Sequence, residues 1–172
     1  RQVRMITERL TKELIEACRI RKSQYAHQKG KGRLDALHYI QRAIEQCHEL
    51  ADEAVELIFI ALEKAFDKVT PSSLQHCLRR LGVHGHLLDT IIELHRNLTF
   101  DVASHYGKSK TYHMKRGVRQ GDPAAALLFI CVYTIMMDDA ERVAHAQDPA
   151  TAHLVKTTLP YTDVFFADDG IL

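Results

Sequence analysis

The chain has 172 residues, of which 46% are hydrophobic and 26% are charged, and its 23 basic and 22 acidic side chains leave a formal net charge of +1. This composition is typical of one ordinary globular domain. A membrane-spanning helix needs about 18 to 20 consecutive apolar residues, and the sequence contains neither such a run nor a signal-peptide pattern at its start. These features argue against a membrane span and favour an intracellular protein, in the nucleus, the cytoplasm or an organelle.

The cysteine pattern bears on disulfides and zinc binding, and the charge balance bears on nucleic-acid binding. The four cysteines lie far apart and form no CxxC pair, so reduced, buried thiols are expected rather than disulfides or a zinc ribbon. A net charge near zero gives no general attraction to nucleic acid, so any such binding has to come from a local patch.

The first third of the chain has helical periodicity. Apolar residues recur every three or four positions over residues 3–18 and 34–50, which predicts two amphipathic helices. Between them, residues 19–33 contain six basic side chains, two glycines and no acidic side chain. This basic loop fits a solvated connector and a phosphate-contacting loop equally well.

The pattern then changes to that of a strand. Residues 55–62 (VELIFIAL) form a short apolar run, which predicts a central strand covered on both faces. Thr70-Pro71 is a helix start, with the threonine as cap, and that helix is expected to end before Gly82. Another helix follows over residues 86–97.

The second half of the chain carries two further strand signals. Residues 99–104 and 110–116 flank residues 106–109 as in a β-hairpin. Asp122-Pro123 opens a long apolar helix, and residues 163–167 form a strand that runs into the turn Asp168-Asp169-Gly170. Strands mixed with separate helices, without regular βαβ alternation, predict an α+β domain.

Two other groups of polar residues are interpreted as surface features. The histidines that could suggest a metal cluster have no familiar zinc spacing, so surface positions are expected for them. Asp138-Asp139 falls on the polar side of its helix and is interpreted as solvated charge. These histidines are His76, His84, His86 and His95.

The adjacent carboxylates Asp168 and Asp169 are the first candidate site. Like charges a few ångströms apart repel unless a cation lies between them. Mg²⁺ is held by carboxylate oxygens and substrate phosphates, and phosphoryl transfer commonly uses two such ions. On its own, however, Asp-Asp-Gly favours an ordinary turn over a metal site.

Together with two further segments in a fixed order along the chain, this turn forms a far more specific pattern than it does alone. The two segments are FIALEKAFDKV at 59–69 and RGVRQGDPAAALLF at 116–129. The ordered set resembles the reverse transcriptases of non-LTR (LINE-like) retrotransposons, whose palm carries KAFD-V, then G-RQGDP before an LLF helix, then an aromatic-ADD hairpin. Upstream, Gln24-Tyr25 and the basic loop as far as Asp35-Ala36-Leu37 are similar to the family's fingers segment, so the resemblance covers nearly the whole chain.

The resemblance implies a fold and a set of site residues. It implies a polymerase fingers-palm fragment with a small antiparallel palm sheet packed on helices and without a thumb, in which residues 1–54 are fingers-like and residues 55–172 are palm-like. The implied residues belong to three groups. Asp168 and Asp169 are implied as ligands of the catalytic Mg²⁺ ions. Phe66 is implied beside the 2′ position of the nucleotide sugar, and Gln120 and Gly121 against the incoming nucleotide and the template. Lys29, Lys31 and Arg33 are implied as contacts to the template or the triphosphate.

Ala61 is the main departure from the family pattern. The family presents an aspartate there, as a third metal ligand, and a methyl group supplies no oxygen. Glu63 does not replace it, because it would lie about 6 to 7 Å further along the strand. Residues 124–126 are also alanines where the family usually has Leu-Ser-Pro. The resemblance therefore implies weak or absent Mg²⁺ binding.

Two functions follow from these observations. The first is an RNA-directed DNA polymerase domain, with an RNA template and a DNA primer as partners, whose nucleotidyl transfer is impaired. The alternative is a non-catalytic structural or RNA-contacting subunit of a larger protein or ribonucleoprotein assembly, built from a retrotransposon-derived fragment. The sequence leaves open whether Ala61 is natural or introduced and whether the chain is part of a longer protein.

Overall fold

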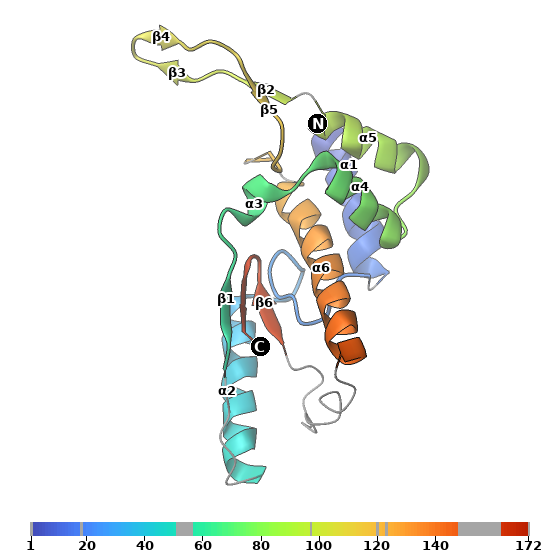
Figure 1. The fold of residues 1–172 in the computed structure, drawn as a ribbon, viewed down its shortest axis with the longest axis vertical. Coiled ribbons are helices and arrows are strands. Elements are labelled where there is room, and N and C mark those ends of the chain that lie inside the picture. The colour runs from blue at the N-terminus through green and yellow to red at the C-terminus, as the bar shows by residue number, and fades with distance from the viewer. Residues whose placement is uncertain are drawn as a thin grey trace.

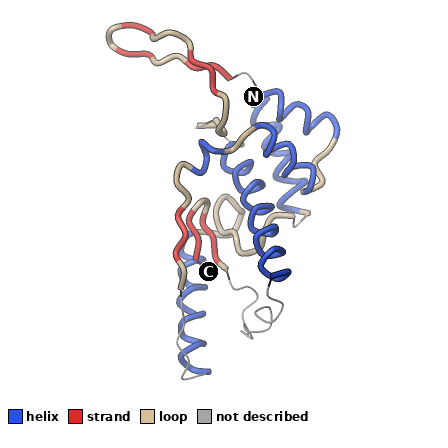
Figure 2. Tube along the Cα trace, in the orientation of Figure 1, coloured by secondary structure: helices blue, strands red, loops and turns tan. Residues whose placement is uncertain are grey.

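A computed structural model describes residues 2–17, 19–50, 57–96, 98–119, 121–122, 124–147 and 163–171. Helices and small antiparallel sheets make up this part of the chain (Figures 1 and 2), so the expected α+β class is confirmed. None of the described helices is long and apolar enough to cross a membrane. The helices are α1 (Gln2–Thr11), the π-helical turn η1 (Lys12–Glu16), α2 (Arg33–Leu50), α3 (Ala65–Lys68), α4 (Pro71–Arg80), α5 (Gly85–His95) and α6 (Ala125–Gln147). The strands are β1 (Phe59–Ala61), β2 (Leu98–Phe100), β3 (Ala103–Ser104), β4 (Gly107–Lys108), β5 (Tyr112–Met114), β6 (Val164–Phe166) and β7 (Asp169–Ile171).

The long helix α6 is the centre of the fold. It lies between the α4–α5 pair and the β1–β7–β6 sheet (Figure 1). Its apolar residues Leu128 and Cys131 are buried together with Leu78 of α4 and Phe165 of β6. Burying an apolar side chain of this size contributes about 1.5 to 3 kcal/mol, so α6 fixes the sheet against the helices.

Helix α4 begins where the sequence predicts. The Thr70 hydroxyl oxygen accepts the N–H of Ser73, the Ser73 hydroxyl oxygen accepts the N–H of Thr70, and Pro71 occupies the first turn. This capping box satisfies N–H groups that have no partner inside the helix. The chain leaves the helix through Gly82, whose φ of +81° suits a residue without Cβ.

The other predicted helices are confirmed with shifted ends. The helix predicted over residues 3–18 is α-helical only to Thr11 and ends at Glu16 after the π-helical turn. Near the start of α6, the Asp122 carboxylate accepts the N–H of Ala124 at 2.8 Å. Pro123 lies outside the described residues.

A strand is confirmed at Phe59–Ala61, within the predicted residues 55–62, but its predicted central position is wrong among the described strands. Residues 51–56 lie outside the described part of the chain, and β1 is an edge strand in a sheet with the order β1-β7-β6. Phe59 is 73% exposed. A continuous apolar run is typical of a covered strand, but it carries no information about how many neighbours the strand pairs with.

The hairpin predicted around residues 106–109 is confirmed, with a different tip. Strand β2 pairs with β5 and β3 pairs with β4, so the turn is His105-Tyr106, and Gly107 and Lys108 belong to a strand. This hairpin projects from the body of the molecule (Figure 1). We call residues 98–116 the projecting arm.

The histidine prediction is confirmed at three positions and wrong at the fourth. His76, His84 and His86 are exposed. His95 is buried at the end of α5, where its Nδ1 lies 2.7 Å from the carbonyl oxygen of Ile91. The residue belongs to the apolar face of its helix, which a search for zinc spacing does not consider.

Candidate carboxylate site

The two acidic residues of the terminal turn lie beside Ala61. Strands β6 and β7 form a hairpin whose turn is Ala167-Asp168, and Asp169 is the first residue of β7. On its other side β7 pairs with β1, and Ala61 is the residue directly opposite Asp169. Directly opposed residues have Cβ atoms about 4.5 to 5.5 Å apart on the same face of the sheet. The methyl group of Ala61 therefore stands next to the carboxylate of Asp169.

A buried glutamine holds the turn of this hairpin. Ala167 has a φ of +59°, an uncommon conformation for a residue with a Cβ. The Gln24 side chain accepts the N–H of Ala167 at 3.0 Å and donates to its carbonyl oxygen at 3.2 Å. Because Gln24 itself is buried, this amide clamp fixes the backbone from which Asp168 and Asp169 project.

The basic loop extends the sheet at its other edge. The N–H of Phe165 donates to Ser23, and the N–H of Tyr25 donates to Phe165, at 2.9 and 2.8 Å. This backbone pairing is parallel and runs along β6. The loop that the sequence predicts as a connector or a phosphate contact is thus also a structural neighbour of the carboxylate hairpin.

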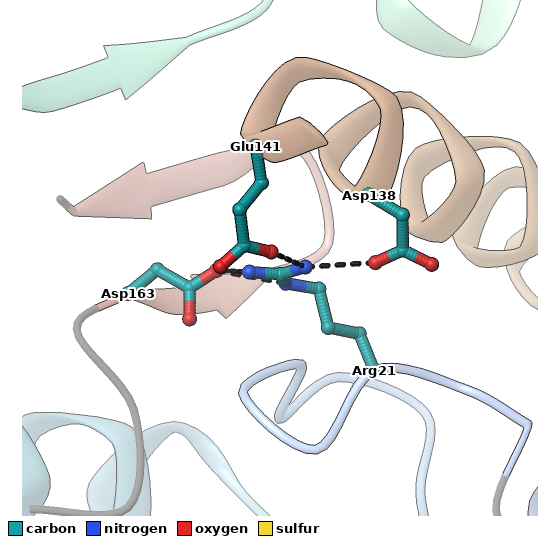
Figure 3. A network of polar contacts seen from close by, with 4 residues as sticks. All are labelled: Arg21, Asp138, Glu141 and Asp163. Carbon is teal, nitrogen blue, oxygen red and sulfur yellow. Dashed lines mark hydrogen bonds and ion pairs between the residues drawn. The ribbon is translucent and has the colours of Figure 1, made fainter. Parts of the chain in front are cut away.

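Arg21 ties the same loop to α6 and to the start of β6. Its guanidinium group contacts Asp163 at 2.6 Å, Asp138 at 2.8 Å and Glu141 at 2.9 Å (Figure 3). Burial opposes the charged form of Arg21, but the hydrogen bond to Glu141 and the charge of Asp163 outweigh it and raise the pKa of the guanidinium above its ordinary value.

Asp138 and Asp139 are partly exposed, as the sequence predicts, but both also form ion pairs that it does not predict. Asp138 is a partner of Arg21, and Asp139 contacts Arg80 of α4 at 2.5 Å and Arg142 at 3.1 Å. The hydrogen bond from Arg80 lowers the pKa of the Asp139 carboxyl group. Both acids face cations from segments that are distant in the sequence, which a helical-wheel argument does not reveal.

The three sequence motifs come together around this hairpin. The N–H of Val118 donates to the carbonyl oxygen of Phe66 at 3.0 Å, so the KAFD and RQGDP segments are directly bonded. The ring of Phe66 is stacked on Phe129 of α6 at 4.3 Å. Further along α6, Tyr133 packs edge-on against Phe165 of the carboxylate hairpin at 5.0 Å.

Tyr133 lies under the hairpin on the core side. Its hydroxyl group is buried and has no hydrogen-bond partner within the described structure. Burial and the nearby carboxylates of Asp163 and Asp168 raise the pKa of Tyr133 to about 12. A Cβ on Gly170 would lie 2.3 Å from the ring of Phe165 and 3.3 Å from the Tyr133 hydroxyl, so glycine is required where β7 crosses these rings.

A groove of about 410 Å³ lies on the opposite face of the sheet, between β1, β7 and helix α2. Asp169, Ala61 and Arg33 line it, and its other lining residues are mainly apolar. The groove brings one predicted carboxylate and one predicted phosphate contact to the same surface. Phe66 and Gly121 do not line it.

The other residues predicted to contact nucleotide or template differ in how accessible their side chains or backbone are. Lys29 is exposed, whereas the ammonium group of Lys31 donates to the carbonyl oxygens of Lys22 and Gln24 within its own loop. Burial and the charge of Lys22 lower the pKa of Lys31. Gly121 is exposed, with a φ of +81° that favours glycine.

Gln120, the remaining predicted contact, lies outside the described residues. The predicted roles of the described contacts in nucleotide binding stay predictions.

The donor set at the hairpin does not make a complete site for Mg²⁺. Asp168 and Asp169 supply carboxylates, but Ala61 supplies none, and Glu63 lies beyond the end of β1, exposed and 4.0 Å from Lys68. Within the described residues, no three acidic, histidine or cysteine side chains gather as they would around a metal ion.

Sequence reasoning missed Gln24, Arg21 and Tyr133 as residues that position this hairpin. Gln24 lies in the segment that is similar to the family's fingers, and an amide side chain, which both donates and accepts hydrogen bonds, could have indicated a role in holding a turn. The contacts of Arg21 join residues more than 100 positions apart, and no local pattern predicts them.

Comparisons with known proteins agree with the arrangement of the three motifs. The model of the family described as reverse transcriptase (RNA-dependent DNA polymerase) matches residues 1–172. Among solved structures, a telomerase from Candida albicans in complex with a fragment of telomeric RNA is similar, with a TM-score of 0.62, 13% identity and coverage of 98% of this chain and 29% of that chain. An apo telomerase from Candida tropicalis, truncated from its C-terminal domain, has a TM-score of 0.58, 15% identity and coverage of 99% and 33%. At these identities the likeness shows the fold, and this chain spans about a third of the telomerase chains.

Proposed function

The chain belongs to the reverse transcriptase (RNA-dependent DNA polymerase) family, and we propose that it is a domain of the non-LTR (LINE-like) type whose nucleotidyl transfer is impaired at the metal site. The KAFD, RQGDP and ADD segments support the subclass. The observation that carries the impairment is the pairing of Ala61 with Asp169. It puts a methyl group next to the carboxylates, where the family presents a third aspartate.

Simple electrostatics explains why this change weakens the site. Mg²⁺ is held by several oxygen ligands, and a cation that lies between two neighbouring carboxylates relieves their mutual repulsion. Asp168 and Asp169 sit on a turn whose backbone is fixed by Gln24. The contacts of Gln24 thus hold the hairpin in place, while the missing third carboxylate reduces its capacity for Mg²⁺.

Replacing Ala61 by aspartate tests this proposal. We expect Ala61→Asp to bind Mn²⁺ or Mg²⁺ at least about tenfold more tightly than the unsubstituted chain in calorimetric titrations. We expect the gain to disappear when Asp169→Asn is added. The matched control is Phe59→Asp, which places the same charge two residues away on the same exposed face of β1 and should give no such gain.

Two results would contradict the proposal. If the unsubstituted chain binds the ions as tightly as Ala61→Asp and extends a DNA primer on an RNA template, the domain is not impaired. If Ala61→Asp gains no affinity while its thermal unfolding is unchanged, Ala61 does not occupy the position of a metal ligand.

The second candidate function is that of an RNA-contacting subunit without catalysis. The exposed cations Lys29 and Arg33 on the basic loop favour it, since phosphate contacts are supplied by accessible lysine and arginine side chains. RNA affinity measured against salt concentration tests this candidate. Lys29→Gln with Arg33→Gln should weaken binding, whereas Arg9→Gln with Lys12→Gln, an equal charge change on exposed residues of α1 and η1, should not.

A further inference from the structure

The projecting arm exposes aromatic rings to solvent. Tyr106 stands at the tip of the arm and is 97% exposed. Phe100 and Tyr112 lie opposite each other on β2 and β5, where their rings are stacked at 5.4 Å and both remain partly exposed. Single exposed apolar side chains are common, whereas several that gather on one small element mark an interaction site. Three rings along one narrow hairpin therefore indicate a binding surface.

The arm is also locally basic, although the chain as a whole is nearly neutral. It contains four lysine or arginine side chains and one acidic side chain, Asp101, while the whole chain has a net charge of +1. Within the described structure, none of these four cations forms an ion pair. The ammonium group of Lys110 lies 5.6 Å from the centre of the Tyr112 ring. The four cations are Lys108, Lys110, Lys115 and Arg116.

Internal hydrogen bonds connect the strands of the arm. Ser109 joins its two short sheets, because its N–H donates to the carbonyl oxygen of Val102 and its hydroxyl oxygen accepts the N–H of Val102, both at 2.9 Å. At the tip, the Ser104 hydroxyl oxygen accepts the N–H of Tyr106. An ordered hairpin loses less conformational entropy on binding than a floppy one. The arm presents its rings and cations in a prepared arrangement.

We infer that the projecting arm binds single-stranded nucleic acid, with bases stacked on Tyr106 and on the Phe100–Tyr112 pair and with phosphates paired to Lys108 and Lys110. Aromatic platforms beside cations are how single strands are bound without sequence preference. A single strand fits better than a duplex, whose base faces are covered by stacking. A protein partner fits less well, because lysine is depleted at protein interfaces.

This inference goes beyond the proposed function. The arm projects at the far end of the molecule from the sheet that carries the carboxylate hairpin (Figure 1), so its binding does not depend on metal ions at Asp168 and Asp169. The arm also has no acidic group paired to its cations among the described residues. Failure of the arm in binding assays and failure of Ala61→Asp in metal titrations are therefore separate results.

Tyr106→Ala tests the stacking contact. The probe is a fluorescein-labelled single-stranded RNA or DNA of about 12 nucleotides, within the site sizes of known single-strand binders, and the readout is fluorescence anisotropy. Loss of one stacked base should weaken the affinity roughly five- to a hundredfold. Tyr106→Phe keeps the ring and should bind like the unsubstituted chain. Neither variant should change thermal unfolding, because the arm contributes no residue to the buried core.

Lys108→Gln with Lys110→Gln tests the phosphate contacts. The slope of log affinity against log salt concentration should fall by about 0.7 for each contact removed from a single strand. Arg9→Gln with Lys12→Gln removes the same charge outside the arm and should leave the slope unchanged. The inference is overturned if both arm variants bind the probe like the unsubstituted chain. It is also overturned if the arm variants lose binding to anionic phosphatidylserine vesicles while oligonucleotide binding is unaffected.

Discussion

The unpaired hydroxyl group of Tyr133 is buried directly beneath the carboxylate hairpin. A buried polar group without a partner costs about 1 to 3 kcal/mol of desolvation. The ring, by contrast, packs favourably between Phe129 and Phe165. The residue thus combines a stabilising ring with a destabilising oxygen at the base of the site.

We therefore expect Tyr133→Phe to raise the free energy of unfolding by about 1 kcal/mol, because it removes the unpaired oxygen and keeps the ring. Urea unfolding followed by circular dichroism measures this change. Tyr106→Phe removes an exposed hydroxyl group and should leave the free energy of unfolding unchanged. A loss of stability in Tyr133→Phe would show that the hydroxyl group makes a favourable interaction, such as a bond to a buried water molecule.

At the scale of elements, the Arg21 network joins three segments that are far apart in the sequence. It connects the basic loop, the second half of α6 and the start of β6. Asp163 is almost fully buried, while Asp138 and Glu141 are about half exposed. The contact to Asp163 is therefore the one that solvent screens least.

Arg21→Gln should lower the free energy of unfolding by about 2 to 4 kcal/mol, because it leaves the buried Asp163 carboxylate without its cation. The matched control is Arg4→Gln, since Arg4 forms an exposed pair with Glu8 on α1 and pairs of that kind contribute at most about 1 kcal/mol. Chemical denaturation of both variants gives the comparison. Equal small losses in the two variants would mean that the Arg21 network is as weak as a surface ion pair.

The pair between Arg80 and Asp139 links α4 to α6 and should act in a pH-dependent way. The hydrogen bond from Arg80 lowers the pKa of Asp139 in the folded chain below its ordinary value of 3.8. The Arg80–Asp139 pair therefore stabilises the folded chain fully when the pH is above the ordinary pKa of an aspartate. This stabilisation is lost as the pH falls through the lower pKa that Asp139 has in the folded chain. Asp139→Asn should lower the melting temperature at neutral pH, and the difference from the unsubstituted chain should shrink as the pH falls below about 4.

The control for this pH dependence is Asp101→Asn in the projecting arm. Asp101 has no ion pair among the described residues, so this variant should melt like the unsubstituted chain at every pH. The difference in melting temperature between Asp139→Asn and the unsubstituted chain could instead stay constant down to strongly acidic pH. That result would contradict the role of the ionised Asp139 carboxylate as the partner of Arg80.

The elements that could be predicted from sequence are those with local causes. The start of α4 depends on Thr70 and Pro71, which are neighbours in the chain, and the carboxylate hairpin depends on an apolar run followed by a turn. Arg21 could not be assigned in this way, because its three partners lie 117 to 142 residues further along the chain. Ion pairs of this kind are set by the tertiary fold, which local periodicity does not describe.

At the scale of the whole molecule, the order of the three motifs indicates the family better than any single motif does. Asp168-Asp169 alone favours an ordinary turn, whereas the pairing of Ala61 with Asp169 agrees with the ordered set. The exposed edge of the sheet was not predictable. The apolar residues of β1 face a groove shared with α2, and their sequence is the same as that of a strand buried between two neighbours.

The uneven distribution of burial predicts uneven stability across the molecule. Leu128 and Cys131 of α6 are fully enclosed, while the projecting arm consists almost entirely of exposed residues. Exposed elements with few buried contacts open locally at a small free-energy cost, whereas core helices exchange their amide hydrogens only through near-global unfolding. Hydrogen exchange followed by mass spectrometry should therefore show fast exchange over residues 98–114 and slow exchange over residues 127–137.

Adding a single-stranded oligonucleotide extends this experiment to function. Bound bases would cover the tip of the arm and should slow exchange over residues 98–114 directly. Exchange over residues 127–137 should slow only by the general stabilisation that a ligand of the folded state confers, which makes the extra protection in the arm the diagnostic result. Lys108→Gln with Lys110→Gln should reduce this protection at the same oligonucleotide concentration. In the free protein, exchange could instead be as slow in the arm as in α6. The short strands of the arm would then share the stability of the core, and the arm would not be a separate, locally stabilised element.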